Sequence, residues 1–341
     1  MKRFWFFRTN LRPLEYYHSF KDLETFKKQS HDFYLLQGIW FLENNIFDEV
    51  TVWRLKPKGK VSDIVFDVGG KKFIQKFVDN FSECFNYPAP NISFFRGGFS
   101  EYDDIIKVNP KFFGLKLYLG CIGKRNFPIY SHLYDWVLTE TQADLSTKSG
   151  RRFIPFYKTA NPEIFRPLEL EKKYDVCWIC NEQVRKGQEF FVKEISKSKF
   201  LKGLTICHVG NNPTLIVNLC REFGVSNISF LGSLERPKIN QILNESRFGL
   251  MTSNLDDGCP RVITEIMCSG TPLLVRKQTR LLEYYRKFGV VVFDDSEVEK
   301  KFEQAFKIYD FLKTETNINM HDLLTMKTIC EKNLELWLHK N

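Results

Sequence analysis

Short apolar runs alternate with helix-length amphipathic segments along nearly all of this 341-residue chain, and this alternation limits the possible folds most strongly. Parallel strands covered by helices on both faces have this pattern, because both faces of such a sheet are buried. In the first half we expect helices at residues 33–44 and 72–85, among strands at residues 3–8, 49–55, 63–68, 92–95, 115–119, 136–139 and 152–157. The pattern predicts an α/β fold with doubly wound sheets.

The alternation begins again after residue 170 and is cleaner there. We expect strands at residues 175–180, 204–209, 227–231, 248–252, 272–275 and 290–293. The helices expected to follow them lie at residues 188–197, 213–223, 237–245, 260–268, 281–288 and 296–312, with a last helix at residues 321–339.

The length of the chain exceeds what one core usually organises, so we expect two domains. Residues 161–168 hold two prolines in a polar stretch without periodicity, which favours a linker. The predicted organisation is an N-terminal Rossmann-like domain at residues 1–160, a linker at 161–170, a C-terminal Rossmann-like domain at 171–318, and a final helix at 319–341 that packs back on the N-terminal domain. The two domains are expected to face each other across a cleft, since ligands of doubly wound sheets bind outside the carboxyl ends of the strands.

The net charge of +9 is compatible with nucleic acid, an anionic membrane surface or a phosphorylated substrate. We do not expect nucleic acid as a partner, because no helix-turn-helix, zinc-finger spacing or aromatic RNA-binding signature accompanies the charge. The apolar N-terminal stretch stops at Arg8, and no apolar run reaches the roughly 20 residues that span a bilayer. Nine cysteines without a spacing pattern indicate free thiols. We expect a cytoplasmic protein whose basic surface is able to hold it at a membrane.

Residues 256–275 carry the strongest chemical pattern, which is an acidic turn, a helix, a tight turn and a strand. Pro260 suits the first position of a helix, and Gly258 permits close approach of the backbone to a ligand. The N–H groups of Arg261 and Val262 then stand at the positive end of the helix dipole. Such a helix start is an anion site, and it suits a diphosphate.

Two carboxylates lie beside this predicted anion site. Asp257 is in the turn, and Glu265 is just over one turn into the helix. Carboxylates repel phosphate but accept hydrogen bonds from hydroxyls, so these two suit a sugar ring and a ribose. A capping aspartate and a solvated helix glutamate are the alternative interpretation.

The same segment resembles the signature of family 4 retaining glycosyltransferases of the GT-B fold. In that family, two acidic residues with seven residues between them are followed by a small-Gly-Thr-Pro turn. Asp257 and Glu265 have that separation, and residues 269–272 supply the turn. Residues 228–232 and 247–253 are similar to the family's preceding strand, helix and strand, so the resemblance covers residues 174–293.

The resemblance implies a role for each matching residue of the segment. Glu265 would hold the ribose of the nucleotide, and Asp257 would contact hydroxyls of the donor sugar. Backbone groups would bind phosphate and sugar at Gly258, Cys259, Pro260, Arg261 and Val262.

A basic clamp on the diphosphate is the family's second feature, and the resemblance places it after the first strand of the C-terminal domain. Lys186 and Gly187 match the family's Lys-Gly pair there, while Asn181 stands where the family has an arginine. Arg185 is the residue that can substitute for that arginine. The clamp would neutralise charge on the departing nucleoside diphosphate; the alternative is that both cations are exposed helix-start residues.

The acceptor is expected in the N-terminal half of the chain. Gly97 and Gly98 follow a predicted strand, and a glycine pair permits close approach of the backbone to a sugar. Many family members carry a histidine after the fifth strand, and His132 is the nearest histidine here. A structural turn at the glycines and a structural histidine are the alternatives.

Together these features predict a glycosyltransferase that moves a sugar from a nucleoside-diphosphate sugar of the UDP or GDP type to a hydroxyl of a glycan or other carbohydrate. The resemblance implies retention of anomeric configuration. The donor is a substrate, and neither a cofactor nor a metal is expected, since no acidic triplet or histidine cluster has ligand spacing. Three alternatives stay open: a sugar-nucleotide epimerase of the GT-B fold, a nucleic-acid binder or DNA-modifying glycosyltransferase, and a non-catalytic sugar-nucleotide binder.

Overall fold

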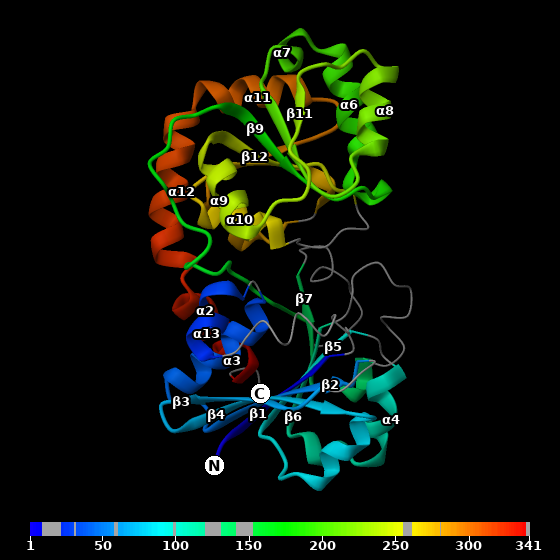
Figure 1. Ribbon diagram of the computed structural model, residues 1–341, viewed down its shortest axis with the longest axis vertical. Coiled ribbons are helices and arrows are strands. Elements are labelled where there is room, and N and C mark those ends of the chain that lie inside the picture. Colours follow the sequence, from blue (N-terminus) through cyan, green and yellow to red (C-terminus); the bar gives the residue numbers. More distant parts are fainter. Residues whose placement is uncertain are drawn as a thin grey trace. The chain divides into compact units, whose positions relative to one another are not determined.

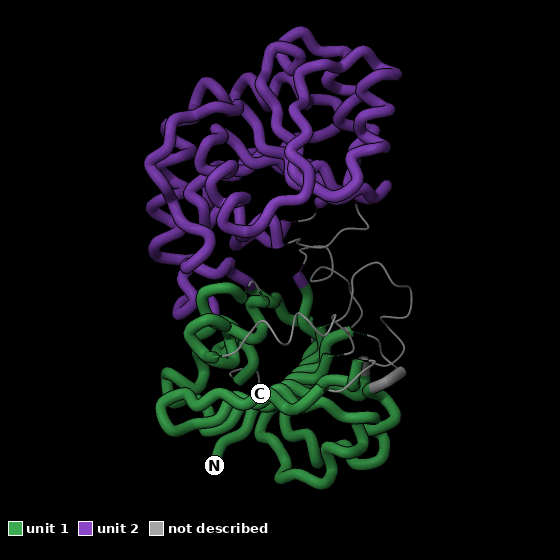
Figure 2. The backbone as a smooth tube through the Cα atoms, in the orientation of Figure 1, with its two compact units in different colours: residues 1–139, 143–157, 330–341 green, residues 140–142, 158–329 purple. Residues whose placement is uncertain are grey.

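The structure is a computed structural model of the chain and describes residues 1–8, 22–30, 32–57, 61–97, 100–119, 131–140, 153–254, 261–279 and 281–338. The chain divides into two compact units (Figure 2). Unit 1 comprises residues 1–139, 143–157 and 330–341, and unit 2 comprises residues 140–142 and 158–329. Each unit has its own sheet with surrounding helices (Figure 1), so the protein has the expected α/β architecture.

The sheet of unit 1 has the strand order β3-β4-β2-β1-β5-β6-β7-β8. All neighbouring strands are parallel except β3 and β4, which are antiparallel. The strands are β1 (Arg3–Arg8), β2 (Glu49–Leu55), β3 (Ile64–Val68), β4 (Lys71–Val78), β5 (Ile92–Arg96), β6 (Leu115–Leu119), β7 (Trp136–Thr139) and β8 (Phe153–Pro155). Residues 4–7 of β1 are all buried, as expected for a central strand with both faces covered.

Residues 71–78 form strand β4, whereas the sequence pattern predicts a helix at residues 72–85. Gly69 and Gly70 have φ angles of 58° and 83°, and they join β3 to β4. A two-residue hairpin turn of this type requires positive φ at both central positions, and glycine adopts it most readily. The helix prediction is therefore wrong, and the glycine pair was the signal for a hairpin. The 3₁₀-helix η1 (Phe81–Asn86) follows β4.

The helices of unit 1 pack aromatic side chains against β1. Phe4 contacts Phe41 of helix α3, with ring centroids 5.3 Å apart, and stacks on Trp337 of helix α13 at 6.3 Å. The helical elements are α2 (Leu23–Gln29), α3 (Phe33–Glu43), α4 (Ser100–Val108), α13 (Met326–Leu338), and the 3₁₀-helices η2 (Pro110–Phe113) and η3 (Ser131–Leu133).

The sheet of unit 2 is parallel throughout, with the strand order β11-β10-β9-β12-β13-β14. Its strands are β9 (Tyr174–Ile179), β10 (Ile206–Val209), β11 (Ile228–Phe230), β12 (Ser246–Met251), β13 (Leu273–Arg276) and β14 (Val290–Phe293). Its helical elements are η4 (Val184–Lys186), α6 (Gln188–Lys197), α7 (Lys199–Lys202), α8 (Thr214–Glu222), α9 (Arg236–Asn244), α10 (Arg261–Cys268), η5 (Lys277–Thr279), η6 (Glu283–Lys287), α11 (Val298–Lys307) and α12 (Tyr309–Leu323).

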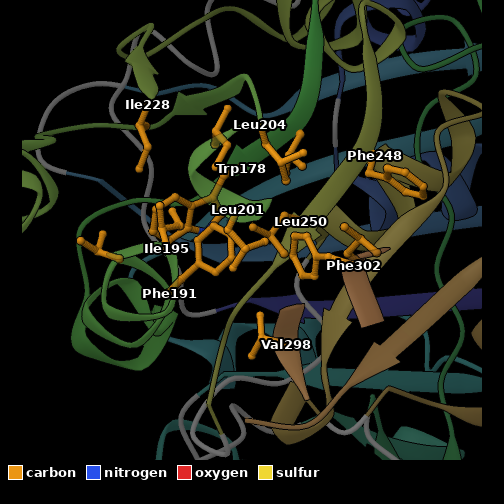
Figure 3. Packing of buried hydrophobic residues seen from close by; sticks show 14 of the residues in the cluster. Trp178, Phe191, Ile195, Leu201, Leu204, Ile228, Phe248, Leu250, Val298 and Phe302 are labelled. Carbon is orange, nitrogen blue, oxygen red and sulfur yellow. The ribbon is translucent and has the colours of Figure 1, made fainter. Parts of the chain in front are cut away.

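A continuous apolar core holds the sheet of unit 2 against its helices (Figure 3). Trp178 of β9 meets Phe191 of α6 edge to face, with ring centroids 5.2 Å apart. Phe191 in turn contacts Phe302 of α11 at 5.8 Å. Cys177 and Cys180 are buried free thiols at this sheet, so the close cysteine pair packs in the core.

The boundary between the two units differs from the predicted linker at residues 161–170. Residues from Lys158 onward belong to unit 2, and Phe165 is buried there. The side-chain oxygens of Asn240 and Asn244 accept hydrogen bonds from the N–H groups of Arg166 and Leu168, at 3.2 and 2.6 Å. The two asparagine side chains of α9 thus supply hydrogen-bond acceptors for the irregular backbone of this segment, and the segment packs on unit 2.

The C-terminal segment also differs from the single helix predicted at residues 321–339. Helix α12 ends at Leu323, and α13 begins at Met326. Thr325 Oγ1 accepts a hydrogen bond from the N–H of Thr328 at 3.0 Å, which caps the start of α13. Residues 330–341 belong to unit 1, and residues 158–329 belong to unit 2.

Candidate active site

The strand order of unit 2 places its topological switch point between β9 and β12. The chain runs from β9 to β10 on one side and returns to β12 on the other side. Ligands of doubly wound sheets bind outside the carboxyl ends of the strands where the order reverses. The segments that follow β9 and β12 are therefore the walls of the candidate site, and Lys186 and Arg185 lie in the first of them.

Three hydrogen bonds fix β9 and the segment after it to the residues that follow β12. Thr252 Oγ1 donates to the carbonyl of Lys186 at 2.6 Å and accepts from Trp178 Nε1 at 3.1 Å. The N–H of Asn254 donates to the carbonyl of Arg185 at 2.8 Å. Both predicted clamp residues therefore have their backbone held at the switch point of the sheet.

Gly187 permits this close approach of the two segments. Its φ is 69°, and a Cβ atom there would lie 2.0 Å from the carbonyl oxygen of Thr252. Only glycine fits this position, because residues with a side chain rarely adopt this φ and the backbone of Thr252 leaves no room for a Cβ atom. The Lys-Gly pair of the sequence thus sets the position of Lys186 against β12.

Replacing Gly187 by alanine should destabilise the protein by about 3 kcal/mol or more, because left-handed strain adds to a backbone clash. Gly224 offers a matched control, since it also has positive φ (65°), but a Cβ added there would meet no atom within 4 Å. Gly224→Ala should cost only about 1–2 kcal/mol. Urea unfolding of the two variants measures the difference, and equal losses would show that the contact with Thr252 is not tight.

Helix α10 supplies the second wall of the site. Arg261 and Val262 are its first two residues, and both are partly exposed. Glu265 lies on its buried side, with only 3% of the side chain exposed. The predicted residues Asp257, Gly258, Cys259 and Pro260 lie outside the described part of the chain.

Glu265 is held by Arg236, a residue that no motif of the sequence indicates. Arg236 Nη1 donates to Glu265 Oε1 at 2.7 Å, and the arginine is 29% exposed. Glu265 Oε2 is buried and has no hydrogen-bond partner among the described residues. A buried carboxylate oxygen without a donor is costly unless a ligand supplies one. The arrangement thus leaves one oxygen of an oriented carboxylate for a hydroxyl.

The small-Gly-Thr-Pro turn is a structural element that positions α10. Gly270 has a φ of 69°, and a Cβ there would lie 2.4 Å from Asn317 Oδ1. Ser269 Oγ donates to Asn240 Oδ1 at 2.7 Å, and Thr271 Oγ1 donates to the carbonyl of Leu243 at 3.0 Å. The turn therefore fixes α10 against α9, which is the packing that brings Glu265 to Arg236.

A further cation, Arg276 at the end of β13, lies beside the predicted clamp. It forms a bidentate ion pair with Asp295 at 2.7 and 2.6 Å, and its guanidinium lies 3.8 Å from the ring centroid of Phe190. Arg276 Nη1 also donates to the carbonyl of Thr252 at 3.4 Å. Because Arg276 is already paired with Asp295, we interpret it as a residue that supports the segment carrying Lys186.

The predicted acceptor residues lie in unit 1. Gly97 follows β5 with a φ of 123°, and its carbonyl accepts a hydrogen bond from Tyr118 Oη at 2.8 Å. His132 is exposed in η3. Gly98 lies outside the described residues. Gly97 therefore has the backbone geometry of a structural turn, at the carboxyl end of a central strand.

Two general properties of the described residues bear on the kind of site. No helix in these ranges combines the length and apolarity needed to cross a membrane. Within the same ranges, no group of three or more His, Cys, Asp or Glu side chains is arranged to hold a metal ion.

Residues 173–307 match the family described as Glycosyl transferases group 1. The sucrose-phosphate synthase of Thermosynechococcus elongatus is similar in structure, with a TM-score of 0.68 and 12% identity over 99% of this chain and 98% of that chain. AviGT4, a glycosyltransferase involved in avilamycin A biosynthesis, has a TM-score of 0.64 and 13% identity over 99% and 97%. An α-glucosyltransferase in complex with UDP and a 13-mer DNA has a TM-score of 0.63 and 13% identity over 98% of each chain. No curated protein matches the sequence.

The two sheets, the switch-point site of unit 2 and these comparisons define the protein as a glycosyltransferase with the GT-B fold. Its similarity to the group 1 glycosyltransferases covers residues 173–307.

Proposed function

We propose that the protein transfers a sugar from a UDP- or GDP-type sugar nucleotide to a hydroxyl of a glycan or other carbohydrate acceptor, with retention of anomeric configuration. The observation that carries the proposal is the Glu265 carboxylate, which is buried, oriented by Arg236 and open at Oε2. A ribose hydroxyl would satisfy that oxygen with a charge-assisted hydrogen bond. A bare phosphate would be repelled by it.

The diphosphate of the donor would lie between the two walls of the site. Lys186 and Arg185 stand at the start of α6, and the N–H groups of Arg261 and Val262 stand at the start of α10. Both helix starts and both side chains favour an anion. We assign the hydroxyls of the donor sugar to Asp257, and phosphate and sugar contacts to the backbone of residues 258–260.

The chemical step needs stabilisation of the leaving nucleoside diphosphate. Negative charge grows on the diphosphate as the bond to the anomeric carbon breaks, and fixed cations stabilise that charge most in the transition state. The acceptor hydroxyl attacks the anomeric carbon from the face that the diphosphate leaves, which retains the configuration. We assign the acceptor to unit 1, at the carboxyl ends of its central strands, with Gly97, Gly98 and His132 as candidate contacts.

DNA is a second candidate acceptor. Two of the similar structures are α-glucosyltransferases with bound DNA, and this chain has a net charge of +9. Phosphate contacts make DNA affinity fall steeply with salt. Duplex binding that weakens steeply between low and physiological salt would favour DNA, and absence of binding would remove it.

A thermal-stability screen tests the donor assignment. UDP, GDP, ADP, dTDP and CMP and their sugars would be added to the full chain, and we expect one nucleotide class to stabilise it. A ligand at 100 times its Kd stabilises a protein by about 2.7 kcal/mol, which is readily measured as a rise in Tm. Absence of a response to every nucleotide would contradict the proposed function. A response without sugar transfer to any carbohydrate would favour a non-catalytic binder or an epimerase.

A further inference from the structure

Arg236 has hydrogen-bond donors that the described part of the protein does not use. A guanidinium carries five N–H donors, and a carboxylate commonly accepts two of them side by side. Here Nη1 alone donates to Glu265 Oε1, at 2.7 Å, and Glu265 Oε2 accepts from no described residue. Within the described ranges Arg236 has no other hydrogen bond or ion pair, and 29% of its side chain is exposed. Its unused donors are therefore accessible to a ligand that binds at Glu265.

The backbone that carries Arg236 is fixed at the carboxyl ends of two strands. Arg236 is the first residue of α9, and the N–H of Gly210, after β10, donates to the carbonyl of Gly232, after β11, at 2.9 Å. Pro237 restricts φ at the next position. Helix α9 also packs against α10, which carries Glu265 (Figure 1). The arginine side chain is thus held at its backbone by α9 and at its tip by Glu265.

The strand order separates Arg236 from the proposed diphosphate site. Helix α9 follows β11 and α10 follows β12, and these two strands lie on opposite sides of β9. In the proposed function the diphosphate lies at the start of α10 and the ribose at Glu265. The base and the 5′-phosphate are attached to opposite sides of a ribose ring. The base would therefore extend toward the start of α9, where Arg236 lies.

The chemistry of Arg236 favours one kind of base. The edge of a base beside the ribose 2′-hydroxyl is the edge that faces the minor groove of a duplex. A pyrimidine presents the acceptor O2 there, whereas guanine adds the amino group at N2, which is a donor. A guanidinium donates hydrogen bonds and accepts none. Arg236 would therefore bind O2 of uracil, and the amino group of guanine would meet it donor to donor.

We propose that Arg236 donates a hydrogen bond to O2 of a pyrimidine base, and that the sugar donor is of the UDP type. This inference rests on the proposed function and narrows its donor from the UDP and GDP types to one. CMP lacks the second phosphate that the clamp at Lys186 would hold, and dTDP lacks one of the two ribose hydroxyls that Glu265 would bind. Arg236 is then a specificity-determining residue that contacts the base as well as Glu265.

Titration calorimetry of the full chain with UDP and its thio analogues tests the proposed contact at a single atom. Sulfur is a poor hydrogen-bond acceptor, so 2-thio-UDP should bind about tenfold more weakly than UDP. 4-Thio-UDP keeps O2 and should bind as UDP does. CDP also keeps O2 and should bind about as tightly as UDP, whereas GDP should bind at least about tenfold more weakly.

The variant Arg236→Gln separates a contact with the base from a purely supporting role. If Arg236 only orients Glu265, its loss weakens the binding of UDP and 2-thio-UDP equally and leaves the ratio of their affinities unchanged. If Arg236 contacts O2, the variant should bind the two nucleotides about equally, because the shorter glutamine does not reach both Glu265 and the base. Lys238→Gln is the matched control, since Lys238 lies on the same helix and bonds Gln241 at the surface. That control should keep the wild-type ratio.

The outcomes separate this inference from the proposed function. Equal affinities of the wild type for UDP and 2-thio-UDP, tighter binding of GDP or ADP than of UDP, or an unchanged ratio in Arg236→Gln would each overturn the role of Arg236. Each of these results would leave a nucleotide site in place. Absence of binding by every nucleoside diphosphate would contradict the proposed function, and this inference with it.

Discussion

Replacing Lys186 by alanine is expected to lower kcat/KM for sugar transfer by about 10²–10³-fold, the range seen when one group that stabilises transition-state charge is removed. Lys186 is partly buried, and its backbone is fixed by Thr252 and Gly187. A cation held in place stabilises the departing diphosphate more than it stabilises the intact donor. We therefore expect most of the loss in kcat, with a smaller change in KM.

Release of nucleoside diphosphate in the presence of acceptor measures this effect. Lys197→Ala is the control, because Lys197 lies at the other end of α6 and pairs with Glu194 at the surface. That variant should keep the wild-type rate. If Lys186→Ala also kept it, the clamp would lie elsewhere and the assignment of Lys186 would be wrong.

The second large effect is expected for Glu265→Gln, which should weaken nucleoside-diphosphate binding by about 10- to 100-fold. A hydrogen bond to a charged group contributes about 1.5–3 kcal/mol, and glutamine keeps the size of the side chain and an oxygen for Arg236. The lost binding free energy should come entirely from the contact between Glu265 and the ribose hydroxyls. Wild-type protein should prefer UDP or GDP over the 2′,3′-dideoxy analogue, and the variant should bind both equally.

Titration calorimetry with the two nucleotides measures this preference directly. Glu299→Gln is a suitable control, because Glu299 accepts a hydrogen bond from Ser198 far along the chain from α10. An unchanged preference for the ribose in Glu265→Gln would show that Oε2 does not accept from it.

Much of the fold follows from patterns within short stretches of sequence. The alternation of apolar runs and amphipathic segments predicts every strand of unit 2 to within a few residues. The reason is that parallel strands buried on both faces consist almost entirely of apolar residues. The failure at β4 has a local cause as well. Lys and Gln between the phenylalanines of residues 71–78 give a pattern that fits both the two-residue repeat of a strand and the 3.6-residue repeat of a helix. Only the preceding glycine pair shows that the segment is a strand.

The partners of the site residues could not be predicted in the same way. Arg236 and Glu265 are 29 residues apart, and they meet because the turn at residues 269–271 packs α10 against α9. The alignment of Arg8, Arg54 and Arg96 is harder still to see, since each arginine ends or nearly ends a separate apolar strand. Their common position depends on the register of β2, β1 and β5, which no single segment of the sequence contains.

The most direct test of the central claim is a crystal structure of the full chain with the nucleoside diphosphate that the screen identifies. We predict a ribose hydroxyl within hydrogen-bond distance of Glu265 Oε2 and the diphosphate between Lys186 and the start of α10. A nucleotide bound away from the carboxyl ends of β9 and β12, or a ribose that does not contact Glu265, would contradict the account.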